Sequence, residues 1–430
     1  HVVACLIAQF LTTNTLCEET DSMSSECRFC GAPLLFTLLN LGSSPLSNSY
    51  IKPDRIGAME PFYPLRVYVC GRCFLVQLEE FEPPQSIFSD YAYFSSFSTS
   101  WLDHAKRYAE KMAAELSLDA NSQVVEIASN DGYLLQYFKE LNIPVLGVEP
   151  AKNVAAEAIR KGIRTETEFF GAAQAAAMRG RGIAADLMTA NNVLAHVPDI
   201  NDFAEGFRLL LAGEGVITFE FPHLLRLIEK LQFDTIYHEH FSYLSLSTVM
   251  RVLETHGLRV FKVEELPTHG GSLRLYVCHQ ESAHPADSSI SRVLETERRA
   301  KLDTLEGYTD FDSSVQKLKR KILKFLIRSK DEGRTIAAYG APAKGNTLLN
   351  YCGVRTDFID YTVDRSPAKQ NTLLPGSRIP VYAPEKIFET QPDYVVILPW
   401  NLKDEISAQM AEIRRWGGKF VTFVPDVEVW

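Results

Sequence analysis

The chain has 430 residues, of which 46% are hydrophobic and 23% charged, and its formal net charge at pH 7 is -10. This composition is typical of a soluble globular protein with more than one domain. The negative charge argues against a general nucleic-acid binder, because contact with a run of phosphates requires a basic surface.

The first residues, HVVACLIAQFL, form an apolar run of about the length of a signal-peptide core. No basic residue precedes this run, no small-residue cleavage pattern follows it, and it is too short to span a bilayer. We therefore expect residues 1–22 to be an extension outside the fold, with Met23 as the natural start. The rest of the chain predicts no membrane segment, and we expect a cytoplasmic protein.

Two C-x2-C pairs come next, Cys27 with Cys30 in CRFC and Cys70 with Cys73 in CGRC. In a chain without a credible secretion signal, this spacing predicts a tetrahedral zinc site, the alternative being two unrelated pairs. Four thiolates leave no position for a catalytic water, so we expect the zinc to be structural. We assign residues 23–85 to a zinc-binding module.

An α/β pattern follows the helical segment LDHAKRYAEKMAAELSL. Buried strands are predicted in SQVVEI, PVLGVE, ADLMTAN and GVITFEF, and helices separate them. Strands that alternate with helices predict a doubly wound parallel sheet, whose ligands bind at the carboxyl ends of the strands. We assign residues 86–305 to this Rossmann-like domain.

The first turn of this sheet, EIASNDG, has one glycine where a dinucleotide-binding turn has three, which disfavours NAD and FAD. Glu149 ends the next strand, where a carboxylate can accept hydrogen bonds from both ribose hydroxyls. With two asparagines after a later strand, the pattern indicates S-adenosylmethionine, although each motif alone is compatible with an ordinary strand and turn. The predicted cofactor-binding residues are Glu126, Ala128, Ser129, Asn130, Asp131, Gly132, Glu149, Asn191 and Asn192.

A second α/β series follows the basic helical stretch VQKLKRKILKFLIRSKDEG, and we assign residues 306–430 to a C-terminal Rossmann-like α/β domain that binds the nucleotide part of the substrate. Its turn YGAPAKGNT has small residues that allow close approach, a helix N-terminus and Lys344, all suited to an anion. Because Lys344 precedes the second glycine, the turn differs from a Walker A loop, and a nucleotide-diphosphate group is a better match than ATP hydrolysis. The alternative is a structural glycine turn. The predicted substrate-binding residues are Tyr339, Gly340, Pro342, Ala343, Lys344 and Asn346.

The segment DTIYHEHFSY places Tyr237, His238, Glu239 and His240 in consecutive positions, and we call these four residues the tetrad. In an extended segment, the two histidines would lie on one side and the other two residues on the opposite side. A turn could bring all four together. The tetrad by itself is equally compatible with a solvated polar loop or a metal-ligand run.

The motifs EIASNDGYLL, ANNVLAHVPD, FDTIYHEHFSYLSL, LPTHGGSLRLY, YGAPAKGNTLLNYCG and ILPWNLKDEI, together with the paired cysteines, resemble those of sugar C-methyltransferases that act on nucleotide-linked 4-keto deoxysugars. The resemblance covers nearly the whole chain from Met23 on. It implies that a base removes the C3 proton, that the electrons delocalise onto the C4 oxygen, and that C3 attacks the methyl group of S-adenosylmethionine. The implied cofactors are S-adenosylmethionine and structural zinc, and the implied partner is a nucleotide-diphosphate 4-keto deoxysugar, with a dTDP-linked sugar expected.

The resemblance also implies catalytic roles. His240 matches the base, Tyr237 a proton donor near the ketone oxygen, and Glu239 a residue that orients or polarises a partner. His196 matches a histidine that could donate to the oxyanion, and Tyr91 matches a residue that closes over the pocket.

Two further histidines, His238 and His269, are expected to be structural, although a substrate contact of His269 stays open. Ala128 stands where many relatives carry glycine. The alternative functions are an O- or N-methyltransferase and a zinc-stabilised nucleotide-binding protein without catalysis. An NAD-linked sugar oxidoreductase is disfavoured by the missing glycines.

Overall fold

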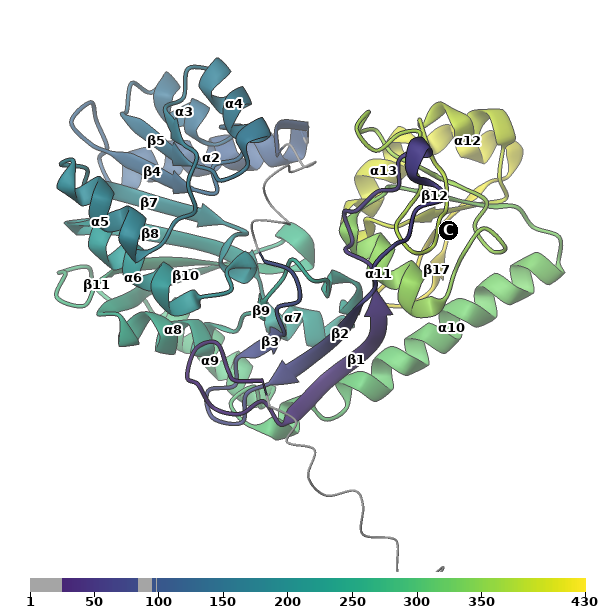
Figure 1. Ribbon diagram of the computed structural model, residues 1–430, viewed down its shortest axis with the longest axis horizontal. Coiled ribbons are helices and arrows are strands. Elements are labelled where there is room, and N and C mark those ends of the chain that lie inside the picture. Colours follow the sequence, from purple (N-terminus) through teal and green to yellow (C-terminus); the bar gives the residue numbers. More distant parts are fainter. Residues whose placement is uncertain (1–24, 84–94, 98) are drawn as a thin grey trace, which may run out of the picture.

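The computed structural model describes residues 25–83, 95–97 and 99–430. The predicted extension 1–22 and Tyr91 lie outside the described residues. The chain forms three sheets, and Figure 1 shows two lobes with the long strands β1 (Phe36–Ser44) and β2 (Tyr63–Val69) running between them.

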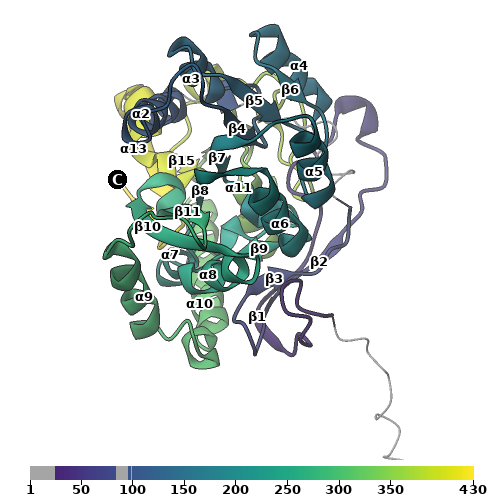
Figure 2. The ribbon, with the colours of Figure 1, turned by 90° about the vertical axis from the view of Figure 1, so that its left-hand side faces the viewer.

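The first sheet has the order β1-β2-β3-β9, with β3 at Val76–Leu78 and β9 at Ser242–Tyr243. β9 directly follows the tetrad and pairs antiparallel with β3, so it lies beside the zinc-binding module although it is remote in sequence (Figure 2). Short η helices lie at Pro53–Arg55 (η1) and Ser95–Phe97 (η2). The pairing of β3 with β9 was not predicted from the sequence.

The second sheet has seven strands in the order β10-β11-β8-β7-β4-β5-β6. The five strands from β8 to β6 are parallel, as predicted, whereas β11 and β10 are antiparallel to their neighbours. These two edge strands were not predicted from the sequence. The short η5 connection joins them as a hairpin, since it is too short for the crossover that parallel pairing needs. The elements are β4 (Val124–Ile127), β5 (Val145–Val148), β6 (Thr165–Glu166), β7 (Ala185–Asn191), β8 (Leu211–Pro222), β10 (Leu258–Leu266), η5 (Thr268–Gly270) and β11 (Ser272–His279).

Helices cover both faces of this sheet, because successive residues of its buried strands point to opposite sides. Val124 packs with α2 and α3, whereas the next residue, Val125, belongs to the cluster that includes α5, α6 and α8. The helices are α2 (Thr99–Glu115), α3 (Leu135–Glu140), α4 (Lys152–Arg160), α5 (Ala172–Gly180), η3 (Leu194–His196), α6 (Ile200–Leu210), α7 (Leu224–Glu229), η4 (Phe233–Thr235), α8 (Leu246–Thr255), α9 (Ser289–Arg299) and η6 (Leu305–Tyr308). In the described part of the chain, no helix combines the length and apolar character needed to cross a membrane.

The third sheet has the order β14-β13-β12-β15-β16-β17, parallel except for the last strand. Its first strand in the sequence, β12, lies between β13 and β15, which makes the carboxyl end of β12 a topological switch point. Its strands are β12 (Ile336–Tyr339), β13 (Thr362–Val363), β14 (Val381–Tyr382), β15 (Tyr394–Ile397), β16 (Lys419–Thr422) and β17 (Glu428–Val429). Its helices are α10 (Phe311–Asp331), α11 (Ala343–Cys352), α12 (Glu385–Thr390), η7 (Trp400–Leu402), α13 (Lys403–Gln409) and η8 (Ala411–Trp416).

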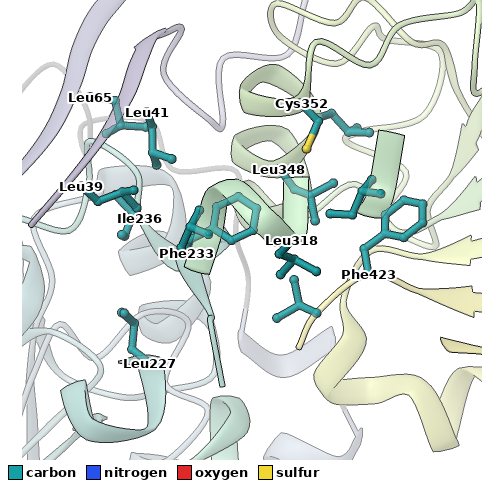
Figure 3. Packing of buried hydrophobic residues seen from close by; sticks show 14 of the residues in the cluster. Leu39, Leu41, Leu65, Leu227, Phe233, Ile236, Leu318, Leu348, Cys352 and Phe423 are labelled. Atoms are coloured by element: carbon teal, nitrogen blue, oxygen red, sulfur yellow. The ribbon is translucent and has the colours of Figure 1, made fainter. Parts of the chain in front are cut away.

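One hydrophobic cluster joins parts of the chain that are far apart in sequence (Figure 3). It contains Leu39 and Leu65 of the first sheet, Ile236 just before the tetrad, and Leu318 and Leu348 of α10 and α11. Apolar burial of this kind stabilises the packed state by roughly 25 cal/mol per Å². The segment that carries the tetrad is therefore held between the first and third sheets.

Candidate active site

The four predicted zinc ligands converge in the structure. Their Sγ atoms all lie within 4.8 Å of one another, with Cys27 3.5 Å from Cys73 and Cys30 3.6 Å from Cys70. Zinc–sulfur bonds of about 2.3 Å in a tetrahedron place sulfur atoms about 3.8 Å apart, so the arrangement fits zinc. Within the described residues, this is the one group of three or more metal-ligating side chains that is close enough to hold a metal.

Gln77 connects the zinc site to the strand that follows the tetrad. Its Nε2 donates to Cys27 Sγ at 3.2 Å, and its Oε1 accepts from the Arg28 amide at 2.9 Å. The backbone of Gln77 pairs with Ser242 of β9. Gln77 therefore contacts both the zinc site and the strand that follows the tetrad.

Glu149 directly follows β5, at the position predicted to bind the cofactor ribose. Its Oε2 accepts from the Asn130 amide and its Oε1 from the Ala151 amide, both at 2.9 Å. Burial raises the pKa of the Glu149 carboxyl, and the two amides oppose this shift. Because each carboxylate oxygen accepts more than one hydrogen bond, Glu149 keeps acceptor capacity for ligand hydroxyls.

Several other predicted cofactor residues present buried polar atoms at the ends of β4 and β7. The atoms that lack a hydrogen-bond partner among the described residues are Ser129 Oγ, Asp131 Oδ1, Asn191 Oδ1 and Asn192 Oδ1. Since buried polar atoms are ordinarily hydrogen-bonded, this set fits a polar ligand such as S-adenosylmethionine. Glu126 lies beneath them in β4, where burial raises the pKa of its carboxyl well above the ordinary value.

The turn after β4 has an unusual backbone. Ala128 has a φ of 57°, in the left-handed region that non-glycine residues seldom adopt. Gly132 has a φ of 76°, and a Cβ there would lie 2.3 Å from Ile163 Cδ1. Glycine is therefore required at the second position, whereas the first tolerates alanine with some strain.

The tetrad forms a tight turn in which the His240 amide donates to the Tyr237 carbonyl at 2.9 Å. The four side chains do not converge. His238 points to the zinc-binding module, where its Nε2 lies 3.1 Å from the Pro64 carbonyl oxygen, as expected for a structural residue. Glu239 accepts from Asn48 Nδ2 at 2.6 Å, and burial raises the pKa of the Glu239 carboxyl to about 7.

His240, Tyr237 and His196 form the centre of the site. The His240 ring centroid lies 4.0 Å from that of Tyr237 and 4.6 Å from that of His196. His240 Nδ1 lies 2.9 Å from the Thr235 carbonyl oxygen, so Nδ1 carries the proton and Nε2 has the lone pair. Burial, with the neighbouring His196, lowers the pKa of His240 well below its ordinary value, and burial lowers the pKa of His196 to about 4. Both imidazoles are neutral at pH 7.

Lys344 reaches toward this centre from the third sheet. It is half-buried, its Nζ donates to Asn401 Oδ1 at 2.8 Å, and it lies 4.5 Å from the centroid of the Trp400 ring. Burial lowers the pKa of Lys344, and its charge contributes to the lowered pKa of His240. The predicted anion-binding turn and the tetrad therefore face one site.

The other predicted substrate-binding residues surround the same turn. Gly340 packs against Pro399, whose Cδ would lie 2.5 Å from an added Cβ, and Pro342 and Ala343 begin α11. Asn346 donates to the Ser47 carbonyl at 2.6 Å, which ties α11 to the first sheet. The Tyr339 side chain belongs to the hydrophobic cluster on one face of the third sheet.

Sequence reasoning missed a polar contact between η4, just before the tetrad, and η7, which follows β15 of the third sheet. Trp400 Nε1 donates to Asp234 Oδ2 at 2.7 Å, and burial raises the pKa of Asp234 to about 6. The two residues are 166 positions apart, and no local pattern indicates that they meet.

A second missed cluster lies at the end of β8. Glu220 Oε2 accepts from Arg274 Nη2 at 2.6 Å and lies 3.0 Å from His104 Nε2. Burial raises the pKa of Glu220, but the hydrogen bond with His104 and the charge of Arg274 outweigh burial and hold the pKa at about 2. A charged residue within the apolar run ITFEF was the available signal.

Three family models match the chain. They describe a zinc binding domain over residues 27–88, a methyltransferase domain over residues 101–263 and a C-methyltransferase C-terminal domain over residues 267–425. The C-methyltransferase NovU of Streptomyces niveus is 33% identical over 404 residues, which cover 94% of this chain and 96% of NovU.

Two solved structures are similar to the central part of the chain. An S-adenosylmethionine-dependent methyltransferase from Clostridium acetobutylicum is 11% identical, with a TM-score of 0.35, over 41% of this chain and 92% of its own. Magnesium protoporphyrin IX methyltransferase from Synechocystis PCC 6803, with bound S-adenosylmethionine, is 15% identical, with a TM-score of 0.31, over 40% of this chain and 79% of its own.

Proposed function

Because this chain belongs to the family of S-adenosylmethionine-dependent C-methyltransferases, we propose that it methylates C3 of a nucleotide-diphosphate deoxysugar that carries a ketone at C4. The observation that supports this proposal is the half-buried group of His240, Tyr237 and His196, whose rings contact one another. Removal of a proton next to a carbonyl requires a neutral base and donors for the developing oxyanion. In this group, His240 provides a neutral imidazole and Tyr237 provides a hydroxyl donor.

In the proposed reaction, His240 Nε2 accepts the C3 proton, because the Thr235 carbonyl holds the proton of this imidazole on Nδ1. The electron pair of the broken C–H bond moves toward the C4 oxygen, where Tyr237 donates a hydrogen bond and His196 lies beside His240. S-adenosylmethionine, when bound, supplies the methyl group that C3 attacks. Glu239, held by Asn48, orients the sugar.

The substrate is held by both α/β sheets in this proposal. The turn from Gly340 to Asn346, with Lys344, binds the diphosphate, and the sugar extends from there to His240. The proximity of Lys344 to the histidines supports this placement, since its charge contributes to the lowered pKa values of His240 and His269. A dTDP-linked 4-keto deoxysugar is the proposed substrate.

The test is incubation with labelled S-adenosylmethionine and a panel of 4-keto nucleotide sugars, followed by location of the label in the product. We expect a new carbon–carbon bond at C3 and exchange of the C3 proton with deuterated solvent. Label on an oxygen or nitrogen atom, without exchange at carbon, would instead show an O- or N-methyltransferase.

A further inference from the structure

Glu149 holds the first turn of the second sheet in a specific way. One carboxylate oxygen accepts from the amide of Asn130, in the turn after β4, and the other from the amide two residues further along its own chain, Ala151. The acid thus lies at the end of one strand and hydrogen-bonds the turn at the end of the neighbouring strand. We call this arrangement an acid clamp.

The third sheet contains a second acid clamp, formed by Asp364. This residue directly follows β13, which pairs with β12 as β5 pairs with β4. Asp364 Oδ2 accepts from the Ala341 amide, in the turn after β12, at 2.7 Å. Its Oδ1 accepts from the amide two residues further on, Ser366, at 2.8 Å.

The backbone around the two clamps matches as well. In each sheet, the turn residue before the clamped amide donates to the carbonyl of the residue before the acid, and the amide of the acid donates to the next strand. The pairs are Ser129 to Val148 and Gly340 to Val363, then Glu149 to Glu166 and Asp364 to Tyr382. The two sheets therefore present a carboxylate at the same place.

The second clamp lies where a ligand is expected to bind. The carboxyl end of β12 is the switch point of its sheet, and the Asp364 side chain is 16% exposed there. Lys369 Nζ lies 3.8 Å from Asp364 Oδ2 and donates to the Ala341 carbonyl at 2.9 Å, which adds a cation beside the turn. Two amides occupy part of the acceptor capacity of a carboxylate, which is about four lone pairs, so Asp364 can accept further hydrogen bonds.

We propose that Asp364 accepts a hydrogen bond from a sugar hydroxyl of a nucleoside diphosphate bound at the third sheet, as Glu149 is proposed to do for the cofactor ribose at the second sheet. The inference rests on the proposed function, because the nucleoside diphosphate is the carrier part of the proposed substrate. It adds the residue that recognises the nucleoside.

The experiment measures binding by calorimetry on the full chain, with dTDP, with its analogue that lacks the 3′-hydroxyl, and with S-adenosylhomocysteine. We expect Asp364→Asn to weaken dTDP binding roughly ten- to hundredfold, the range for a hydrogen bond to a charged group, and to leave S-adenosylhomocysteine binding unchanged. Glu149→Gln should weaken binding of S-adenosylhomocysteine and leave dTDP binding unchanged. The matched control is Asp360→Asn, which removes an exposed carboxylate at the other end of β13 and should change neither affinity.

The analogue separates recognition from a merely structural role. For the unaltered chain, loss of the 3′-hydroxyl should cost about the same factor as Asp364→Asn, and the variant should no longer distinguish the two ligands. Equal affinity of the unaltered chain for both ligands would overturn the inference, and this measurement requires no variant to fold. If Asp364→Asn lost the same factor of affinity for dTDP and for the analogue without the 3′-hydroxyl, the inference would also be overturned. If dTDP binds as expected but no sugar is methylated at carbon, the proposed function fails and the inference on Asp364 stands.

Discussion

At the scale of single residues, the contacts of the two tetrad histidines separate their proposed roles. His240 and His238 are separated by one residue, yet His240 contacts Tyr237 and His196, whereas His238 contacts the Pro64 carbonyl of the zinc-binding module. The Thr235 carbonyl fixes the tautomer of His240. The tight turn of the tetrad is what separates the two side chains.

Replacement His240→Asn tests the proposed base. An asparagine amide can still donate to the Thr235 carbonyl but cannot accept the C3 proton, so turnover should fall by roughly 10²- to 10⁴-fold while both ligands still bind. The same variant should lose C3 proton exchange with deuterated solvent. The control, His238→Asn, should retain exchange. Exchange that persists in His240→Asn but disappears in Tyr237→Phe would assign the base to Tyr237.

The raised pKa of Glu239 predicts how the stability of the folded chain depends on pH. Burial raises the pKa of its carboxyl from an ordinary 4.5 to about 7, so the folded chain binds this proton more tightly than the unfolded chain does. Its contribution to stability is therefore fully present below about pH 4.5 and is lost as the pH rises through about 7.

Replacement Glu239→Gln removes this titration and retains an acceptor for Asn48. At low pH, the variant and the unaltered chain should have nearly the same free energy of unfolding. As the pH rises, the variant should become the more stable of the two, by about 3 kcal/mol at pH 8. Urea denaturation at several pH values measures this difference. The control Glu254→Gln, at an exposed position of α8, should leave the pH profile unchanged. A constant difference across the pH range would show that burial of Glu239 is not the cause.

At the scale of elements, the pairing of β9 with β3 links the zinc site to the tetrad. Gln77 of β3 hydrogen-bonds Cys27 Sγ with its side chain and pairs with Ser242 through its backbone. His240 lies two residues before Ser242. A structural zinc can therefore affect turnover without contacting the substrate.

Replacement Cys73→Ser should reduce zinc content from about one ion per chain and should lower turnover in parallel, because three thiolates hold zinc less tightly than four. Elemental analysis and initial rates measure the two quantities. Cys278→Ser, at an isolated buried cysteine, is the control for loss of a thiol and should retain zinc. Full turnover in zinc-free protein would contradict the proposed link between β3 and β9.

At the scale of the whole molecule, the segment that carries the tetrad and the third sheet's domain meet at Asp234 of η4 and Trp400 of η7. The Trp400 indole donates to the Asp234 carboxylate, and its ring would contact any side chain placed at Gly270. Lys344 lies over the same ring. This contact lies between the segment that carries the tetrad and the predicted diphosphate-binding turn.

Replacement Trp400→Phe removes the donor and leaves the Asp234 carboxylate buried without it, which costs about 1–3 kcal/mol of stability. We also expect a raised KM for the nucleotide sugar and an unchanged affinity for S-adenosylmethionine, because the contact lies between the sheets and away from Glu149. Trp416→Phe is the control, since Trp416 donates to the Pro392 carbonyl within the third sheet's own domain. If Trp400→Phe and Trp416→Phe had the same KM for the nucleotide sugar, the Trp400–Asp234 contact would not position the substrate.

The sequence alone predicted the features that depend on short spacings. The C-x2-C pairs indicated the four zinc ligands, and the alternation of apolar strands and helices indicated two α/β sheets. The position of Glu149, after the second predicted strand and at a suitable sequence distance from the first turn, indicated a ribose-binding acid. These signals are local because strand and helix periodicity and ligand spacing act over a few residues.

Tertiary structure decided the rest, because it depends on contacts between residues that are distant in the sequence. It placed β9 beside β3, turned His238 away from His240, joined Asp234 to Trp400, and brought Lys344 close to the histidines. It also showed that Asp364 and Glu149 occupy the same place in two sheets. No sequence pattern encodes these pairings, since burial of shared apolar surface selects which segments meet and only then determines the neighbours of each polar side chain.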